Sequence, residues 1–424
     1  MSTKKHTLWN IAGSGLPLLM AAVTIPVLMK ELELESFGVL TLIWTLIGYF
    51  SLFDLGLGRS ITHHVSAKLA SNSAAEIAGI IKAGLTFAGL AGLLGGGILL
   101  VLANPLSNSW LHVSKAIEQQ TYHALVWSAI GIPFVVLSSG VRGVLEAYSQ
   151  FDRVNITRIL QGVTTFAFPV LSVFAFGPDL GTVALWLVIS RVLTLVIYVY
   201  FLGKAIPQWS STVGNTVQKS YLLRFGAWMT ISNTISPLLI YLDRFVISGM
   251  FGAAVVAYYT VPFEVLTKLL ILPGALGSAL FPRLSREYQA DYQETHRLMM
   301  RAVIVTTSTM AVLCTLAAAA YFPLVSWWMS QDFAQASWRI ASLLAFGVFV
   351  NSLGFVFYTA VQAKVGARQT ALLHLTELVF FVPVLYALSS LLGLEGAAVA
   401  WTVRVSFDAL VMWWFYTKGV RHAV

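Results

Sequence analysis

The chain has 424 residues, of which 58% are hydrophobic and 10% are charged, and its formal net charge is +8. A soluble domain usually carries about 25% charged residues, so this composition excludes a soluble globular protein and indicates a polytopic membrane protein. The one cysteine, Cys314, excludes an intramolecular disulfide framework. The basic residues form no cluster interleaved with aromatic side chains, so we expect no nucleic-acid partner.

Twelve apolar segments, each near the roughly 20 residues that cross a bilayer as a helix, follow one another along the chain. The predicted spans are residues 8–29, 38–58, 78–102, 122–140, 156–176, 181–202, 225–248, 256–280, 302–323, 338–360, 370–391 and 395–416. Lys4 and Lys5 before the first span imitate a signal peptide, but the apolar run continues to Met29 and more spans follow. We therefore expect an uncleaved first helix in an all-α membrane protein.

The lysine and arginine residues outside these spans fall mostly on one side of the membrane. On the other side lie only Lys30, Lys115 and Arg339, the last at the very start of the tenth span. Because basic residues accumulate in cytoplasmic loops, this asymmetry predicts that both termini are cytoplasmic.

The two halves of the chain resemble each other in short segments. Pro17 and Pro237 lie in similar stretches of the first and seventh spans, and Arg191 and Arg404 lie near the middle of the sixth and twelfth. We expect two pseudo-symmetric six-helix lobes around a central cavity, related by an axis along the membrane normal. Residues 1–203 form the first lobe, 204–224 a cytoplasmic linker and 225–424 the second lobe in this prediction.

The common signatures of enzymes and nucleotide-binding proteins are absent. The sequence contains no Walker-type loop, no GxGxxG, no GxSxG and no HExxH. We therefore expect neither an enzyme, nor a cofactor, nor a metal site.

Ionisable residues inside the predicted spans are the candidates for function, because each costs roughly 2.5–3.5 kcal/mol at a helix centre. Arg404 and Asp408 are four positions apart, and so are Glu264 and Lys268. Each pair either neutralises itself on its own helix or belongs to a functional site. Arg191 has no acid within one turn, which favours a functional role for it.

Three further acids and bases complete the set. Asp243 and Arg244 are adjacent and point apart on a helix, so each is expected to contact either the eighth span or a substrate. Glu377 is isolated in the eleventh span and is the best candidate for a titratable coupling site.

The cytoplasmic end of the second span combines Asp54 and Arg59 with glycines, which predicts a cap or gate contact there. Residues 59–76 that follow are predicted to be a cytoplasmic amphipathic loop. Small residues recur every four positions in the third span and predict close helix packing. They are Gly84, Ala88, Gly92 and Gly96.

Several segments together resemble one family of transporters. They are residues 10–13 (NIAG), 37–38 (FG), 53–58 (FDLGLG), 242–247 (LDRFVI), 280–285 (LFPRLS) and 393–398 (GLEGAA). These motifs are similar to those of the oligosaccharide flippases of O-antigen and capsule assembly. Those proteins are the polysaccharide transporter branch of the multidrug/oligosaccharidyl-lipid/polysaccharide exporter superfamily.

The resemblance implies a twelve-helix protein of the bacterial inner membrane whose two lobes open alternately to either face. Its substrate would be an oligosaccharide repeat unit on an undecaprenyl pyrophosphate carrier, moved from the cytoplasmic to the periplasmic leaflet. Membrane lipids and other polysaccharide assembly proteins would be its further partners.

A pyrophosphate needs cations in a wet cleft, and arginine binds phosphate oxygens with two parallel hydrogen bonds. The expected substrate-binding cations are Arg191 and Arg404, followed by Lys268 and Arg244. Coupling or charge-pair roles are expected for the four intramembrane acids. These acids are Asp243, Glu264, Glu377 and Asp408.

Two alternatives stay open. A cation-coupled multidrug exporter of the same fold would need acids in its cavity, and the first span contains none. A membrane polysaccharide polymerase or ligase would need a large periplasmic loop, whereas the outward connections at 103–121 and 324–337 are short.

Overall fold

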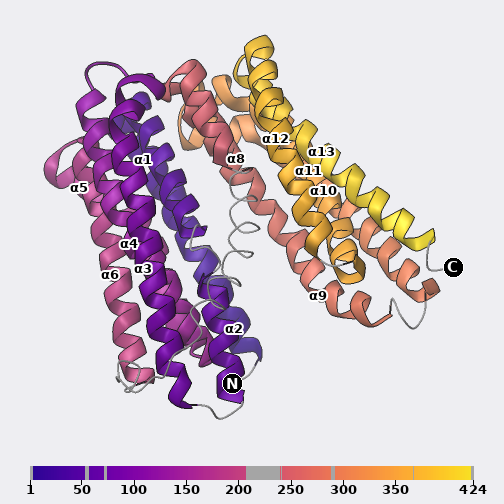
Figure 1. Ribbon diagram of the computed structural model, residues 1–424. Helices are drawn as coiled ribbons and strands as arrows, with labels where there is room; N and C mark the ends of the chain where they lie inside the picture. Colours follow the sequence, from indigo (N-terminus) through magenta and orange to yellow (C-terminus); the bar gives the residue numbers. More distant parts are fainter. Residues whose placement is uncertain are drawn as a thin grey trace. The chain divides into compact units, whose positions relative to one another are not determined.

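The computed structural model describes residues 3–52, 57–70, 74–206, 239, 241–287, 292–365 and 367–421 (Figure 1). Helices account for the regular structure throughout these residues. The first helices are α1 (Thr3–Leu52), α2 (Leu57–Ala70), α3 (Ala74–Pro105), α4 (Glu118–Ala147), α5 (Phe151–Phe176) and α6 (Leu180–Ala205). Residues 241–251 are helical, and then follow α8 (Val256–Thr267), α9 (Ile271–Glu287), α10 (Tyr292–Trp328), α11 (Gln331–Val365), α12 (Ala367–Leu392) and α13 (Leu394–Arg421). Short helical turns stand at η1 (Leu106–Trp110), η2 (Ala253–Val255) and η3 (Lys268–Leu270).

Nine helical stretches within these described residues are long and apolar enough to cross a membrane. The predicted all-α polytopic membrane fold is therefore confirmed. Spans three to six coincide with α3 to α6, and spans nine to twelve with α10 to α13. The eighth span corresponds to α8, η3 and α9 in succession. Most of the seventh predicted span, 225–248, and residues 207–224 of the predicted linker lie outside the described residues.

The first predicted span and most of the second lie in one helix, α1, which is interrupted at one residue. Glu33 has φ 62° and ψ 164°, which breaks the helical path between the two spans. Beyond the break, Glu35 Oε1 accepts a hydrogen bond of 2.6 Å from the Ser114 backbone N–H. A Cβ on Gly38 would lie 2.0 Å from the Ala253 carbonyl oxygen, so only glycine fits there. The FG segment at 37–38 is thus explained by packing of the chain against itself.

The prediction that residues 59–76 form a loop is wrong. Most of this segment is α2, and its Ile61 and Val65 are buried in a core shared with α3, α4 and α6. The Thr62 hydroxyl lies 2.9 Å from the carbonyl oxygen of Gly58 and 2.8 Å from that of Gly143. The apolar face of its amphipathic pattern is therefore packed on protein.

The small-residue strip of α3 packs closely against α4, as the sequence predicted. A Cβ on Gly92 would lie 2.7 Å from Cα of Pro133, and one on Gly96 would lie 2.6 Å from the Ala129 carbonyl oxygen. These positions require glycine because the two backbones approach too closely for any side chain.

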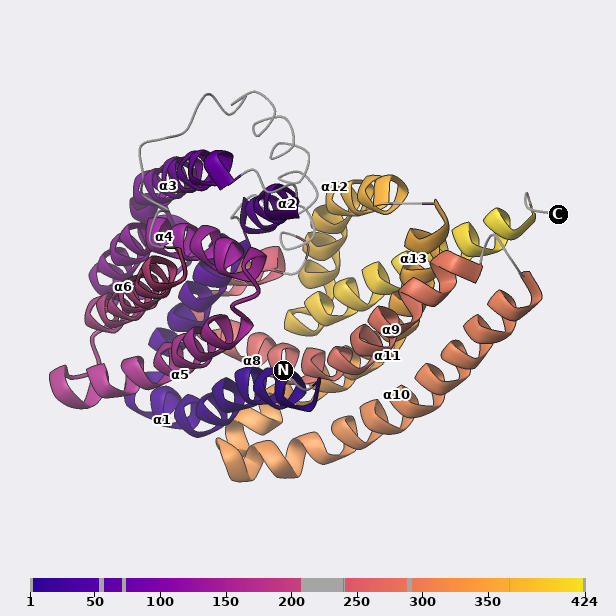
Figure 2. The same ribbon diagram turned by 90° about the horizontal axis from the view of Figure 1, so that it is seen from below.

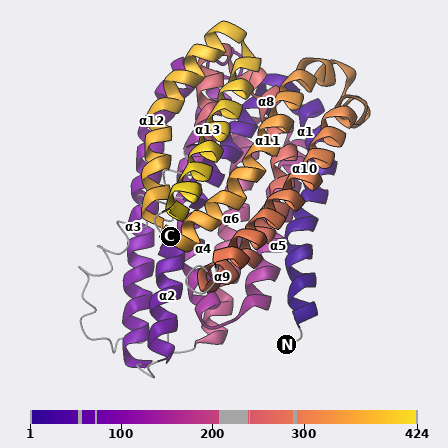
Figure 3. The ribbon, with the colours of Figure 1, turned by 90° about the vertical axis from the view of Figure 1, so that its right-hand side faces the viewer.

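The chain divides into two compact units. The first consists of Met1–Tyr241 with Gly252–Ala254, and the second of Leu242–Phe251 with Val255–Val424. In the first, α4 lies between α3 and α6, and α5 contacts α1 and α6 (Figure 2). In the second, α11 lies between α10 and α13, and α12 contacts α13 (Figures 2 and 3). Helices at equivalent places in the two halves therefore make the same pairings inside their own unit.

Candidate functional site

One group of charges in the second unit joins the helical segment 241–251 to α8. Arg244 is 2% exposed, and its Nη2 lies 2.7 Å from Glu264 Oε1. The other oxygen of Glu264 lies 3.0 Å from Lys268 Nζ, whose side chain is 46% exposed. The Glu264 carboxylate thus bridges two cations, and one of them is Lys268, four positions along the same helix.

Asp243 makes side-chain contacts of its own, different from those of Arg244. It is fully buried and accepts a hydrogen bond from the equally buried Tyr259 hydroxyl of α8. Its other oxygen accepts a 2.8 Å hydrogen bond from the Arg244 backbone N–H. Of the two roles left open for Asp243 and Arg244, the contact with the eighth span is the one observed.

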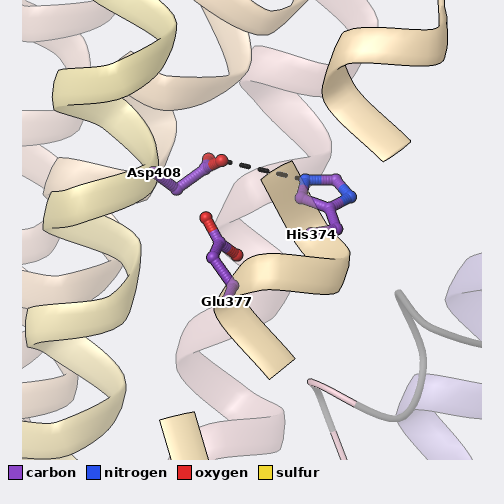
Figure 4. A group of neighbouring side chains, drawn as sticks. All are labelled: His374, Glu377 and Asp408. Carbon is purple, nitrogen blue, oxygen red and sulfur yellow. Dashed lines mark ion pairs between the residues drawn. The ribbon is translucent and has the colours of Figure 1, made fainter. Parts of the chain in front are cut away.

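A second group lies between α12 and α13. Arg404 of α13 has its Nη1 3.5 Å from Glu377 Oε2 of α12, so Glu377 is not isolated. The predicted pairing of Arg404 with Asp408 on the same helix is not the one formed. Asp408 instead has Oδ1 3.7 Å from Nε2 of His374, which lies one turn before Glu377 on α12 (Figure 4).

His374, Glu377 and Asp408 turn toward one another (Figure 4). One ligand-type atom from each lies within 4.8 Å of the others, a spacing at which they could hold a cation. Sequence reasoning missed His374. The signal was available, because His374 and Glu377 are three positions apart on one helix and therefore share a face.

The two groups belong to one polar network in the second unit. The positive charge of Arg404 acts on both Asp243 and Tyr259. The Phe263 ring of α8 contacts both Arg244, whose Cζ is 5.3 Å from the ring centroid, and the Trp401 ring of α13, whose centroid is 5.2 Å away. Helices α8, α12 and α13 are thus tied to the segment 241–251 by charge and aromatic contacts.

Arg191 lies in the first unit, on α6, and is only 7% exposed. Among the residues that the structure describes, no carboxylate pairs with it and its Nε has no hydrogen-bond partner. Its helical neighbour Ser190 lies 2.6 Å from the Thr164 hydroxyl of α5, and the Thr194 hydroxyl donates to the Ser190 carbonyl oxygen. Arg191 is therefore a buried cation, and the hydroxyl groups of its neighbours on α6 are engaged in bonds of their own.

The structure describes only one of the two residues of the predicted cytoplasmic gate. Asp54 lies outside the described residues, and Arg59 lies in the first turn of α2. The role of these two residues as a gate stays a prediction. Gly58 beside them has a packing role, since a Cβ on Gly143 would lie 2.2 Å from the Gly58 carbonyl oxygen.

Comparison with known proteins finds a family model and a full-length relative that match this chain. Residues 3–288 match the family model described as "Polysaccharide biosynthesis protein". The chain is 32% identical over 422 residues to a "Putative O-antigen transporter" of Shigella flexneri, covering 99% of this chain and 98% of that protein.

Solved structures show the same fold at low sequence identity. A multidrug resistance MATE family transporter of the MOP superfamily, in an inward-facing conformation, superposes with a TM-score of 0.80 at 13% identity. The match covers all of this chain and 96% of the other. A MOP superfamily transporter from Pyrococcus furiosus matches with a TM-score of 0.69 at 14% identity, over 98% of this chain and 94% of the other.

Proposed function

The chain belongs to the polysaccharide biosynthesis protein family, and on that ground we propose that it is a flippase for lipid-linked oligosaccharides. It moves undecaprenyl-pyrophosphate-linked repeat units from the cytoplasmic to the periplasmic leaflet of the bacterial inner membrane. The product serves assembly of O-antigen or of another surface polysaccharide. The chain acts as a transporter and not as an enzyme, together with membrane lipids and other assembly proteins.

The observation that carries this proposal is the full-length similarity to the O-antigen transporter of Shigella flexneri. Identity of 32% extends over nearly the whole of both chains, so the similarity is not confined to one half of this chain. The fold it shares with MOP superfamily transporters supports transport by alternating access of two lobes.

The intramembrane cations fit a substrate that carries a pyrophosphate. Arg191 is buried without a carboxylate partner among the described residues, so its charge is available for an anion. Lys268 is the most exposed of the four predicted cations. It shares the Glu264 carboxylate with Arg244, because each cation pairs with one of the two carboxylate oxygens. We assign substrate contact to Arg191 and Lys268, and to Arg404 when its ion pair with Glu377 opens.

The test is a deletion strain examined for undecaprenyl-linked repeat units by mass spectrometry. The strain should accumulate them and lose surface polymer. Complementation with Arg191→Ala or Lys268→Ala should leave surface polymer reduced at least tenfold at equal membrane levels of protein, and Arg191→Lys should restore part of it. Full surface polymer in both alanine variants would refute the assignment of these cations.

The matched control is Lys115→Ala, which removes a cation that is 99% exposed and paired with Glu118 at 3.8 Å. This variant should support normal polymer. Loss of polymer in Lys115→Ala with full activity of Arg191→Ala would instead favour a periplasmic polymerase or ligase. Increased drug susceptibility of the deletion strain, with no accumulated lipid-linked unit, would favour a multidrug exporter.

A further inference from the structure

We propose that Glu377 and Asp408 share one exchangeable proton, that His374 gives it access, and that this proton couples the transport cycle. The coupling part of this inference rests on the transport function proposed above. The binding part concerns only the side chains of α12 and α13.

The first argument is geometric. His374 and Glu377 share one face of α12, while Arg404 and Asp408 share one face of α13, and the two faces meet inside the second unit. Glu377 is 3% exposed, so its carboxyl group is withdrawn from solvent. Figure 4 shows the two carboxyl groups turned toward each other with the His374 ring beside them.

The second argument is a count of charge. In the part of the chain that the structure describes, the charges that act on Glu377 are those of Asp408 and Arg404, and the same two residues act on His374. With both carboxyl groups ionised and His374 neutral, two negative charges face one guanidinium. A buried net charge is costly in a membrane helix, and one proton bound by this group removes it.

The third argument concerns atoms without partners. Glu377 Oε1 and Asp408 Oδ1 are buried and have no hydrogen-bond partner among the described residues. Two ionised carboxylates can only accept hydrogen bonds, so they cannot satisfy each other. A single proton supplies the missing donor, and neighbouring carboxyl groups commonly hold one proton between them.

The same count separates a proton from a divalent metal ion. Three ligand atoms at this spacing could hold a divalent cation. Such an ion would add two positive charges beside Arg404, whose Nη1 is 3.5 Å from Glu377, and would leave the group with a net positive charge. The proton leaves the group neutral, and for this reason we assign the site to a proton rather than to a divalent ion; a monovalent cation would balance the charge equally and is an outcome of the test below.

The proton enters the group through His374, which lies near the start of α12 and faces the last turns of α11. His374 is the most exposed of the three residues, with 22% of its side chain accessible. Its ring stacks on Tyr358 of α11, with centroids 6.2 Å apart and an interplanar angle of 9°. The Tyr358 hydroxyl accepts a hydrogen bond from Gln362, one turn before the end of α11 at Val365. Beyond Arg404, Asp243 and Tyr259 are the next titratable groups of the network.

The binding part is tested on the purified full-length protein by infrared difference spectroscopy over a pH titration. The wild type should show the carbonyl stretching band of one buried carboxylic acid that disappears at alkaline pH. Glu377→Gln and Asp408→Asn, both isosteric, should each abolish this pH-dependent band. His374→Asn should retain the band but slow its hydrogen–deuterium exchange at least tenfold.

The matched control is Glu395→Gln, because Glu395 also forms a 3.5 Å pair with an arginine, Arg339, but at an exposed place in the same unit. It should leave the band unchanged. A wild-type protein without such a band would overturn the proton site, and this outcome needs no variant to fold. Binding of Zn²⁺ or Na⁺ by the wild type, measured by calorimetry and lost in Glu377→Gln, would also overturn it in favour of a metal ion.

The coupling part is tested in the deletion strain. Glu377→Gln and Asp408→Asn should accumulate lipid-linked repeat units like the deletion itself, and Glu395→Gln should not. Normal polymer in both variants, with the infrared band lost, would overturn coupling while the flippase function stands. Conversely, a deletion strain without accumulated units would refute the flippase while the infrared result still decides the proton site.

Discussion

Asp243 illustrates how single residues are held inside this protein. Its carboxyl group is fully buried and receives one hydrogen bond from the Tyr259 hydroxyl and one from the Arg244 backbone. A buried carboxyl group that loses a donor retains the cost of desolvation without the compensating bond. The interaction therefore stabilises the contact between the segment 241–251 and α8.

We predict that Tyr259→Phe lowers the stability of the protein by about 1.5–3 kcal/mol, the usual worth of a hydrogen bond to a charged group. Thermal unfolding in detergent, followed by tryptophan fluorescence, measures the change. The ring of Tyr259 keeps its stacking on Phe263 at 5.7 Å, so the variant removes only the hydroxyl.

Tyr321→Phe is the control at the same scale. The buried Tyr321 hydroxyl lies 3.0 Å from the Ser337 hydroxyl, which keeps its own 2.7 Å bond to the Phe333 carbonyl oxygen. This variant should lose only about 0.5–1.5 kcal/mol, the net worth of a bond between neutral groups. An equal loss in both tyrosine variants would contradict the special role of the Asp243 carboxyl.

At the scale of elements, glycines decide how closely helices cross. The α2–α4 crossing brings the Gly58 carbonyl oxygen to 2.2 Å from where a Cβ on Gly143 would be. The Thr62 hydroxyl lies within hydrogen-bonding distance of both carbonyl groups and joins the two helices at this point. The carbonyl oxygen belongs to the backbone, so it cannot rotate away from an added methyl group.

Gly143→Ala should therefore force α2 away from α4 and destabilise the protein by about 1–3 kcal/mol, as overpacking of a core does. The matched change is Gly203→Ala on α6, where a Cβ meets nothing within 4 Å. That variant should be neutral or more stable by about 0.5–1 kcal/mol, because alanine favours a helix over glycine. Melting temperatures of the two purified variants compare them directly, and a stable Gly143→Ala protein would show that this crossing is loose.

On the scale of the whole molecule, the orientation in the membrane follows from the basic residues. Two basic residues, Arg142 and Arg153, flank the turn between α4 and α5. After the turn between α10 and α11, the first basic residue is Arg339, within α11. The positive-inside rule predicts that the α4–α5 turn and both termini face the cytoplasm and that the α10–α11 turn faces the periplasm.

Reporter fusions test this orientation. A fluorescent protein at the C-terminus should be fluorescent. Alkaline phosphatase inserted after Met329 should be active, and the same enzyme inserted after Gln150 should be inactive. The reverse pattern of phosphatase activity would invert the proposed direction of transport.

The local part of this structure could be read from the sequence. Composition and the length of the apolar runs predict membrane helices because each span must satisfy its own backbone hydrogen bonds. The ion pair between Glu264 and Lys268 and the packing strip on α3 are also local, since their members are three or four positions apart on one helix.

Contacts between helices were decided by the tertiary structure alone. Spacing on α13 favoured Asp408 as the partner of Arg404, but the partner is Glu377, 27 positions away on α12. Spacing likewise gave no reason to bring His374 to Asp408 or to bury the face of α2 against α3 and α4. Helical periodicity specifies which residues share a face, whereas the packing of helices decides which two faces meet.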